Sequence, residues 1–138
     1  MCYDITKFAT TPDQGCYAAA NLDKAVQYSR LVPTLTQLKG CLASGSPFVF
    51  GFTVYESFES KQVASSGIVP MPNLGSEQVL GGHAVLCVGY DDAQQRFTVR
   101  NSWGPSWGQG GYCLMPYAYL TDRNLADDFW TIRLVSPA

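Results

Sequence analysis

Two short strand-like segments separated by a connection of four residues constrain the fold of this chain most strongly. "HAVLCVGY" (83–90) and "QRFTVR" (95–100) are rich in β-branched and aromatic residues, which suit a strand. The "DDAQ" between them is a short polar connection of the kind that closes a hairpin. We therefore expect an antiparallel pair of strands in which Tyr90 lies opposite Gln95.

This hairpin brings the only histidine of the chain close to an asparagine. The same pairing sets His83 opposite Ser102, so Asn101 lies within one residue of that partner. A register error of one residue turns a side chain to the other face, so the pairing predicts proximity and not geometry. The alternatives are a structural histidine between turn glycines and an asparagine that ends a strand.

An imidazole beside a side-chain amide is a combination with a defined chemistry. The imidazole can act as a base near neutral pH, and an amide oxygen that accepts its N–H fixes the orientation and the tautomer of the ring. A thiolate nucleophile needs no stronger partner than an amide, because a Cys–His ion pair forms before attack. His83 with Asn101 therefore favours cysteine chemistry over serine chemistry.

Further strands and one helix are expected around the hairpin. "TLTQLKGCLASG" (34–45) places leucines at helical spacing after Thr34, a suitable N-cap. "FVFGFTVY" (48–55) is an unbroken apolar run, which predicts a strand buried on both faces. The other segments are predicted as strands at 25–32, 111–118 and 129–135, a long loop at 56–82, a polar stretch at 119–128 and irregular chain at 1–20. The expected fold class is α+β, mainly antiparallel β, with five or six strands in a barrel-like domain and short peripheral helices.

Composition and charge exclude several classes of function. The net charge is −2 and the lysines and arginines form no run, so neither nucleic acid nor an anionic membrane is an expected partner. No apolar run reaches the length of about 18 residues that a membrane span needs, and the first residues show no signal-peptide pattern. With one histidine and no C-x-x-C spacing among five cysteines, we expect no metal site and no cofactor. The sequence leaves the cellular compartment open.

Two longer strings carry a resemblance to a known family. "GGHAVLCVGYDD" (81–92) and "NSWGPSWGQGGYCLMP" (101–116) closely resemble the carboxyl-terminal half of papain-family cysteine peptidases. The resemblance continues in order through nearly the whole chain, and "IVPMP" and "MPYAYL" make it most similar to the bacterial and archaeal branch. It implies the barrel-like right-hand half of the papain-like fold and the hydrolysis of peptide bonds.

The resemblance also implies roles for individual residues. His83 would be the general base and then the general acid, with Asn101 as its orienting partner. Trp103 would cover the hydrogen bond between them from water, and Trp107 would line the leaving-group side of the cleft. Core packing is the alternative for both tryptophans. Four glycines would give the tryptophan loop its backbone freedom: Gly104, Gly108, Gly110 and Gly111.

The nucleophile of the family has no convincing counterpart in this chain. Cys16 in "DQGCYAAA" follows Gln14 by two residues, whereas the family's oxyanion glutamine lies six residues before its cysteine, and the Gly-Ser pair before that cysteine is absent. Cys16 lies 67 residues before His83, whereas the family spacing is about 130–150. The other four cysteines are expected to pack in the core or, for Cys2, to lie at the terminus: Cys2, Cys41, Cys87 and Cys113.

These observations predict a chain that supplies histidine and asparagine but no nucleophile, and that is inactive alone. Residues 1–20 would be a linker from the missing cysteine-bearing half, and residues 21–138 the β-domain. The expected partners are a peptide or protein substrate, the missing amino-terminal half and, through the exposed cleft face, a second copy of the chain. Gly51 and Ala84 are candidate walls of a substrate pocket whose preference the sequence does not reveal. The alternatives are a non-catalytic peptide- or protein-binding module, and another Cys/His hydrolase or acyltransferase.

Overall fold

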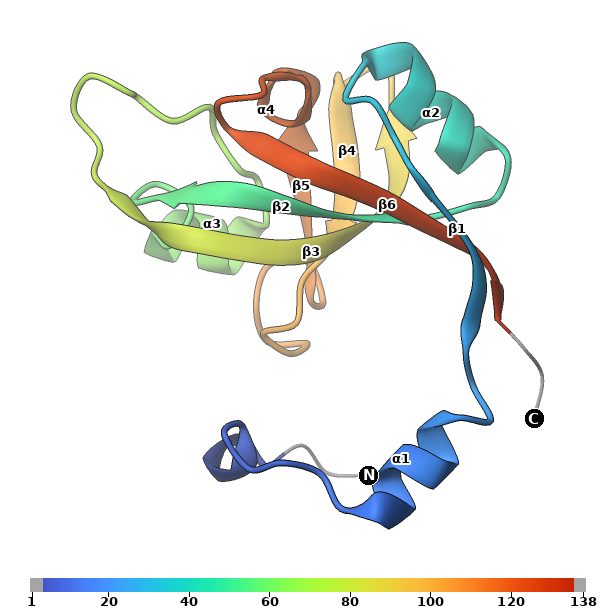
Figure 1. Cartoon of the computed structure of the whole chain (residues 1–138). Helices are drawn as coiled ribbons and strands as arrows, with labels where there is room; N and C mark the ends of the chain where they lie inside the picture. Colours follow the sequence, from blue (N-terminus) through green and yellow to red (C-terminus); the bar gives the residue numbers. More distant parts are fainter. Residues whose placement is uncertain (1–3, 136–138) are drawn as a thin grey trace.

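One six-stranded antiparallel sheet forms the centre of the molecule (Figure 1). The structure is a computed structural model that describes residues 4–135, so Cys2 lies outside the described residues. The strands follow the order β1-β6-β2-β3-β4-β5, which leaves β1 and β5 at the edges. Their bounds are β1 (Ala25–Arg30), β2 (Phe48–Tyr55), β3 (Val79–Asp91), β4 (Arg96–Arg100), β5 (Tyr112–Pro116) and β6 (Ala126–Val135). The predicted fold class, α+β with mainly antiparallel strands, is confirmed.

Short helices surround the sheet, and one of them lies where irregular chain was expected. Their bounds are η1 (Ile5–Lys7), α1 (Gln14–Ala20), α2 (Leu35–Ala43), α3 (Lys61–Ser66) and α4 (Tyr117–Thr121). Helix α2 matches the predicted helix, with Thr34 as its N-cap. The prediction of irregular chain at 1–20 is wrong for α1, because the Asp13 carboxylate accepts the N–H of Cys16 at 2.9 Å and caps a helix there.

Helix α3 interrupts the segment 56–82, which was expected to be one long loop. The Ser60 hydroxyl accepts the N–H of Val63 at 3.2 Å, and Gly67 ends the helix with a φ of 69°. Serine at the N-cap and a left-handed glycine after the last turn are the signals that mark a helix in this segment.

Helix α4 replaces the end of the strand predicted at 111–118. Pro116 has a φ of −57° and no N–H to donate to a sheet, so the ladder between β4 and β5 ends with its pairing to Arg96. The chain then turns into helix at Tyr117, and this turn buries Tyr119 and Leu120.

The hairpin forms as predicted, but its register does not. Tyr90 pairs with Phe97, and Gln95 belongs to the turn with a φ of +53°. A bulge between Cys87 and Gly89 then shifts the ladder by one residue back towards the predicted pairing. The predicted pairing of Tyr90 with Gln95 is therefore wrong by two residues, because the four-residue turn spans residues 92–95 and not 91–94.

Strand β2 is central, yet only one of its faces is fully buried. Phe48, Phe50, Phe52 and Val54 point into the core, whereas the residues between them are partly or fully exposed. The prediction that residues 48–55 are buried on both faces is wrong for this reason. An apolar run also suits a strand whose second face is hydrophobic but uncovered by the rest of the described chain.

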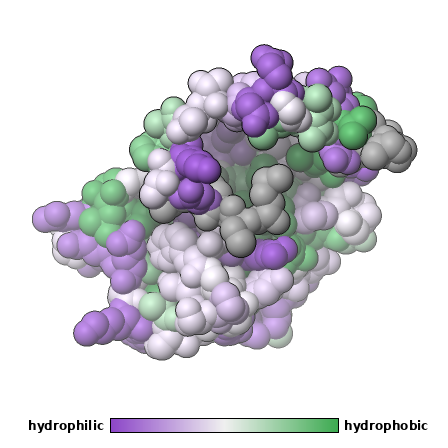
Figure 2. Space-filling model, turned by 90° about the horizontal axis from the view of Figure 1, so that it is seen from below, coloured by the Kyte–Doolittle hydropathy of each residue, from purple (hydrophilic) through white to green (hydrophobic). Residues whose placement is uncertain are grey.

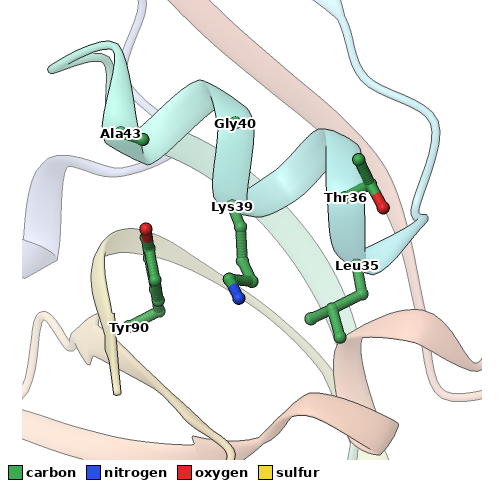
Figure 3. A pocket seen from close by; sticks show the side chains of 6 residues that line it. All are labelled: Leu35, Thr36, Lys39, Gly40, Ala43 and Tyr90. Atoms are coloured by element: carbon green, nitrogen blue, oxygen red, sulfur yellow. The ribbon is translucent and has the colours of Figure 1, made fainter. Parts of the chain in front are cut away.

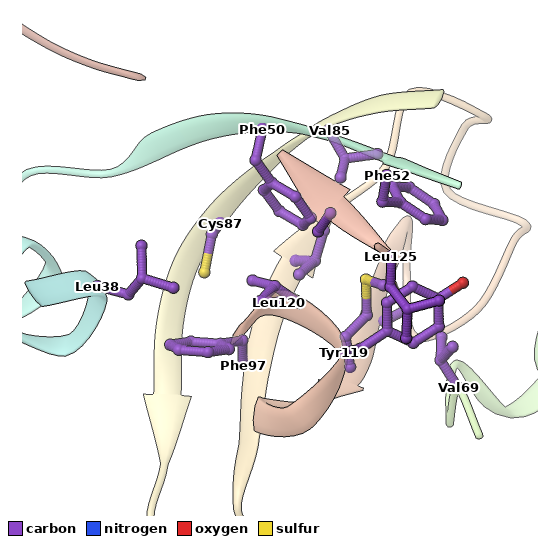
Figure 4. Close-up of a cluster of buried hydrophobic side chains, with 14 of the residues drawn as sticks. Leu38, Phe50, Phe52, Val69, Val85, Cys87, Phe97, Tyr119, Leu120 and Leu125 are labelled. Carbon is purple, nitrogen blue, oxygen red and sulfur yellow. The ribbon is translucent and has the colours of Figure 1, made fainter. Parts of the chain in front are cut away.

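The core lies on the inner face of the sheet, beneath α2 and α4 (Figure 4). Its centre is aromatic: the rings of Phe50 and Phe129 stack at a centroid distance of 5.3 Å, and Phe48 meets Phe97 edge-on at 6.3 Å. Truncating a buried ring of this kind to alanine typically costs about 3–5 kcal/mol. The core therefore anchors β2, β4 and β6, and β3 lies between β2 and β4.

The segment before β1 stands away from the sheet, and β1 itself is an exposed edge strand. Helix α1 has no buried residue and all six residues of β1 are exposed. Figure 1 shows α1 below the sheet, and the view from below in Figure 2 shows a recess with hydrophobic surface inside it. The expected boundary between a linker at 1–20 and a domain at 21–138 remains a prediction. Within residues 4–135 no helix has the length and hydrophobicity to span a membrane.

We expect the protein to lose stability at alkaline pH because the thiols of Cys87 and Cys113 are buried. Burial raises the pKa of Cys113 to about 12 and raises that of Cys87 still further. In the unfolded chain a thiol ionises near pH 8.5, so the stabilising effect of these buried neutral thiols is complete below that pH and is lost as the pH rises towards the folded values. We expect the free energy of unfolding to fall by roughly 3 kcal/mol between pH 8 and pH 10.

Urea unfolding at a series of pH values measures this loss, and the double variant Cys87→Ala/Cys113→Ala is the control. The variant is less stable at pH 7 because it creates cavities, but its stability should vary much less between pH 8 and pH 10. Equal pH dependence in both proteins would show that the thiols are not responsible.

Candidate active site

His83 and Asn101 meet at the open end of the hairpin. Nε2 of His83 lies 2.9 Å from Oδ1 of Asn101. The N–H of Ser102 donates to the same oxygen at 2.8 Å, which identifies this atom as the carbonyl oxygen of the amide. An amide oxygen can only accept, so the neutral imidazole carries its proton on Nε2. The structure therefore brings the two predicted residues together in a defined tautomer.

The other ring nitrogen is left for chemistry. Within residues 4–135, Nδ1 of His83 has no hydrogen-bond partner. Asn101 is only 7% exposed, and its backbone N–H donates to the carbonyl of Gly111 at 2.9 Å. Hydrogen bonds therefore hold both its backbone and its side-chain oxygen. Its Nδ2 is buried without an acceptor among the described residues. A fixed Nε2–H leaves an Nδ1 lone pair that can take a proton from a nucleophile.

Aromatic rings hold the imidazole in this orientation. The ring of Trp103 stacks on His83 at a centroid distance of 5.1 Å and an interplanar angle of 23°. Phe52, which pairs with His83 across β2 and β3, meets the imidazole edge-on at 5.8 Å. One face of the stacked Trp103 ring therefore lies against the imidazole. The side chain is 41% exposed, so the rest of it is open to solvent. The covering role that the resemblance implies for Trp103 stays a prediction.

Trp107 lies deeper than a cleft-lining residue would. It is 9% exposed and packs edge-on against Trp103 at a centroid distance of 5.4 Å. Core packing, the alternative considered for both tryptophans, describes most of the surface of Trp107. Its expected place on the leaving-group side of the cleft remains a prediction.

Phe58 joins these rings, and sequence reasoning missed it. It is 1% exposed and contacts Phe52, Trp103 and Trp107 at centroid distances of 4.9, 5.6 and 5.6 Å. It lies in the turn after β2, inside the segment predicted as loop. Pairing 48–55 with 83–90 in sequence would have placed Phe52 beside His83, but nothing in the sequence marks the turn residue Phe58 as buried.

The tryptophan loop is fastened to α3 through glycine backbone. The N–H of Gly108 donates to the carbonyl of Ala64 at 2.7 Å, and the side chain of Gln109 donates to the carbonyl of Ser66 at 2.9 Å. Gly108 has a φ of 58°, and a Cβ on it would lie 2.4 Å from the carbonyl oxygen of Tyr112. Only glycine fits this position, so the loop depends on it to hold Trp103 and Trp107 in place.

None of the cysteines between residues 4 and 135 is hydrogen-bonded to the imidazole. Cys16 is exposed on α1, whereas Cys41, Cys87 and Cys113 are buried. The Cys41 thiol donates to the carbonyl of Ser46 at 3.2 Å. No thiol between residues 4 and 135 forms a hydrogen bond to His83, and no group of three or more His, Cys, Asp or Glu side chains in that range could hold a metal ion.

Two hollows differ in their relation to this pair. One, of about 420 Å³, is lined by Val49, Ala84, Val85, Leu86, Arg100, Asn101 and Ser102, and so adjoins the His83–Asn101 pair. The other, of about 330 Å³, lies between α2 and Tyr90 (Figure 3). There Lys39 forms an ion pair with Asp92 at 2.6 Å and lies over the Tyr90 ring at 4.9 Å. The second hollow contains no candidate catalytic residue, so the first is the relevant one.

Comparison with known proteins gives a consistent result. Residues 4–127 match the model of the papain family cysteine protease. An uncharacterised peptidase C1-like protein of Acanthamoeba polyphaga mimivirus is 45% identical over 142 residues, which cover 97% of this chain and 45% of that protein. A cathepsin B-like protein of Giardia intestinalis is 40% identical over 92 residues, which cover 64% of this chain and 28% of that protein.

Solved structures agree with the sequence relatives. Xylellain, a cysteine protease from Xylella fastidiosa, superposes with a TM-score of 0.84 and 46% identity, covering 91% of this chain and 46% of that one. Digestive procathepsin L2 from Tenebrio molitor gives a TM-score of 0.58 and 25% identity over 79% of this chain and 34% of that one. The chain spans less than half the length of these relatives. The resemblance to the family is confirmed, and the chain belongs to the papain family of cysteine proteases.

Proposed function

We propose that this chain supplies the base and the orienting amide of a Cys-His-Asn peptidase, and that the nucleophilic thiol comes from outside its 138 residues. The hydrogen bond from Nε2 of His83 to Oδ1 of Asn101 carries the proposal, because it leaves Nδ1 open for a thiol. The only described thiol at the surface, Cys16, lies on α1, which stands apart from the sheet (Figure 1).

The proposed reaction proceeds through a thioester. A thiolate attacks the carbonyl carbon of the peptide bond, and the protonated His83 then gives its Nδ1 proton to the leaving amine as the C–N bond breaks. In the second half, Nδ1 takes a proton from water while the water oxygen attacks the thioester. The C–S bond breaks and the acid product leaves. Asn101 keeps Nε2 protonated throughout and so keeps Nδ1 as the reacting nitrogen.

The partner that would bring the thiol is the half of the relatives that this chain does not cover. The hollow beside Asn101 has apolar walls at Val49 and Leu86, and Arg100 at its rim has no ion pair among residues 4–135. A surface of this kind favours association with another polypeptide. The completed site would take a peptide or protein substrate.

The same surface supports a second candidate function. Val49 is 41% exposed and Val88, on the neighbouring strand, is 38% exposed. If no cysteine-bearing half exists, this apolar face would serve a non-catalytic module that binds a peptide, another protein or a second copy of the chain. Sedimentation of the purified chain separates the last case from the other two, since only self-association gives a concentration-dependent dimer.

The purified 138-residue chain is expected to show no thiol-dependent hydrolysis of a fluorogenic peptide. The physical reason is that a base without a nucleophile within reach cannot form the thioester. The measurement is release of the fluorophore in the presence of a reductant, with Cys16→Ala as the matched variant. Hydrolysis by the chain that Cys16→Ala abolishes would overturn the proposal.

A further inference from the structure

The carboxylate of Glu77 links its own loop, at Asn73, to Ser57, which lies 20 residues earlier in the chain. Its Oε2 accepts the N–H of Ser57 at 2.9 Å, and its Oε1 accepts the N–H of Asn73 at 2.8 Å. Hydrogen bonds from the backbone of Asn73, and then from Ser57, lower the pKa of Glu77 below its usual value. Both oxygens are engaged, so the charged group is fixed between the loop before β3 and the turn after β2.

The Ser57 end of this link leads directly to a buried ring. The N–H of Phe58 donates to Tyr55 at 2.9 Å, and that of Ser60 donates to Ser57 at 3.3 Å, so Phe58 sits in a tight turn. Its side chain is 1% exposed. Moving Ser57 therefore moves the ring of Phe58 against closely packed neighbours.

Those neighbours are the rings that flank the histidine. Phe58 meets Phe52 edge-on at 4.9 Å and Trp103 edge-on at 5.6 Å. Trp103 and Phe52 in turn contact the His83 imidazole at centroid distances of 5.1 and 5.8 Å. A continuous series of contacts thus runs from the Glu77 carboxylate to the imidazole.

We propose that Glu77 is a positioning residue for His83, because its carboxylate holds Ser57, and through it the ring of Phe58, against the two rings that orient the imidazole. The catalytic meaning of this rests on the proposed function of His83. The positioning itself does not, and it can be measured without substrate.

Glu56 provides a matched control on the same turn. Its Oε2 accepts the N–H of Gln78 at 3.1 Å, so it also links the turn to the loop before β3. Glu56 accepts one N–H, that of Gln78, with one oxygen. In Glu56→Gln the amide oxygen of the glutamine can accept the same N–H. In Glu77→Gln, by contrast, one of the two N–H groups faces an amide nitrogen and loses its acceptor.

The imidazole of the single histidine gives a direct readout. Long-range ¹H–¹⁵N spectra of the labelled chain, taken where the ring is neutral, report which nitrogen carries the proton, and all imidazole signals belong to His83. We expect Nε2–H in the unaltered chain, a shift towards a mixture with Nδ1–H in Glu77→Gln, and no change in Glu56→Gln. The indole signal of Trp103 should move with the imidazole in Glu77→Gln alone.

Two further variants keep the test decisive. Phe58→Leu should reproduce the His83 shift, since it removes the ring through which Glu77 acts. Ser57→Ala keeps the backbone N–H that donates to Glu77 but removes the hydroxyl, which helps to lower the pKa of Glu77, and it should shift the His83 signals in the same direction but less, even if Glu77→Gln does not fold. If Glu77→Gln folds and its imidazole signals are unchanged, the positioning role is overturned. If Glu77→Gln does not fold, unchanged imidazole signals in Ser57→Ala overturn it instead. Because peptide hydrolysis is not the readout, such a result leaves the proposed peptidase function standing.

Discussion

Replacing His83 with alanine should lower kcat/KM about 10³-fold or more in an enzyme completed with the amino-terminal half of xylellain. Without the imidazole, nothing takes the proton of the thiol, protonates the leaving amine or activates water. The measurement is hydrolysis of a fluorogenic peptide by a chimaera in which that half precedes this chain. The 46% identity and TM-score of 0.84 between the corresponding halves make this partner suitable.

Two further variants calibrate the effect of His83→Ala. Asn101→Ala should cause a smaller loss, because the imidazole remains but its tautomer is no longer held. Tyr90→Ala, at the far end of the same strand, changes no residue of the proposed site and should leave kcat/KM nearly unchanged. A chimaera that keeps its activity after His83→Ala would exclude His83 as the base.

The hairpin shows both what could be predicted from the sequence and where prediction stopped. Residues typical of strands on either side of the polar "DDAQ" were enough to predict two antiparallel strands and to bring His83 near Asn101. Register was not predictable, because nothing in the sequence shows that the four-residue turn begins at Asp92 and not at Asp91, or that β3 is bulged between Cys87 and Gly89. The two side chains meet even so, since Asn101 follows the end of β4 and its backbone is fixed by Gly111.

The helices that were missed have a common physical cause. Helix α1 spans seven residues and α3 six, too short for an apolar period to stand out. Their capping residues Asp13 and Ser60 are visible in the sequence, but such residues are just as common in turns. The surroundings of His83 were missed for another reason: Phe58 and Glu77 act through contacts between distant segments, which only the folded chain reveals.

Gly108→Ala should lower the free energy of unfolding by roughly 2–5 kcal/mol. A residue with a side chain is strained at a φ of 58°, and the added Cβ would lie 2.4 Å from the carbonyl oxygen of Tyr112. Because that oxygen belongs to the backbone of β5, relief requires the tryptophan loop to move away from α3. Urea unfolding followed by tryptophan fluorescence measures the loss of stability and the displacement of the loop together.

Gly110→Ala separates the two causes. Gly110 has a similar φ of 67°, but a Cβ there would meet nothing within 4 Å. Its alanine variant should therefore lose only the cost of the left-handed conformation, roughly 1 kcal/mol. If the two variants lose equal stability, backbone strain alone explains the glycines of this loop. If Gly108→Ala loses more, contact between the loop and β5 selects glycine at that position, and Trp103 owes its place over His83 to that contact.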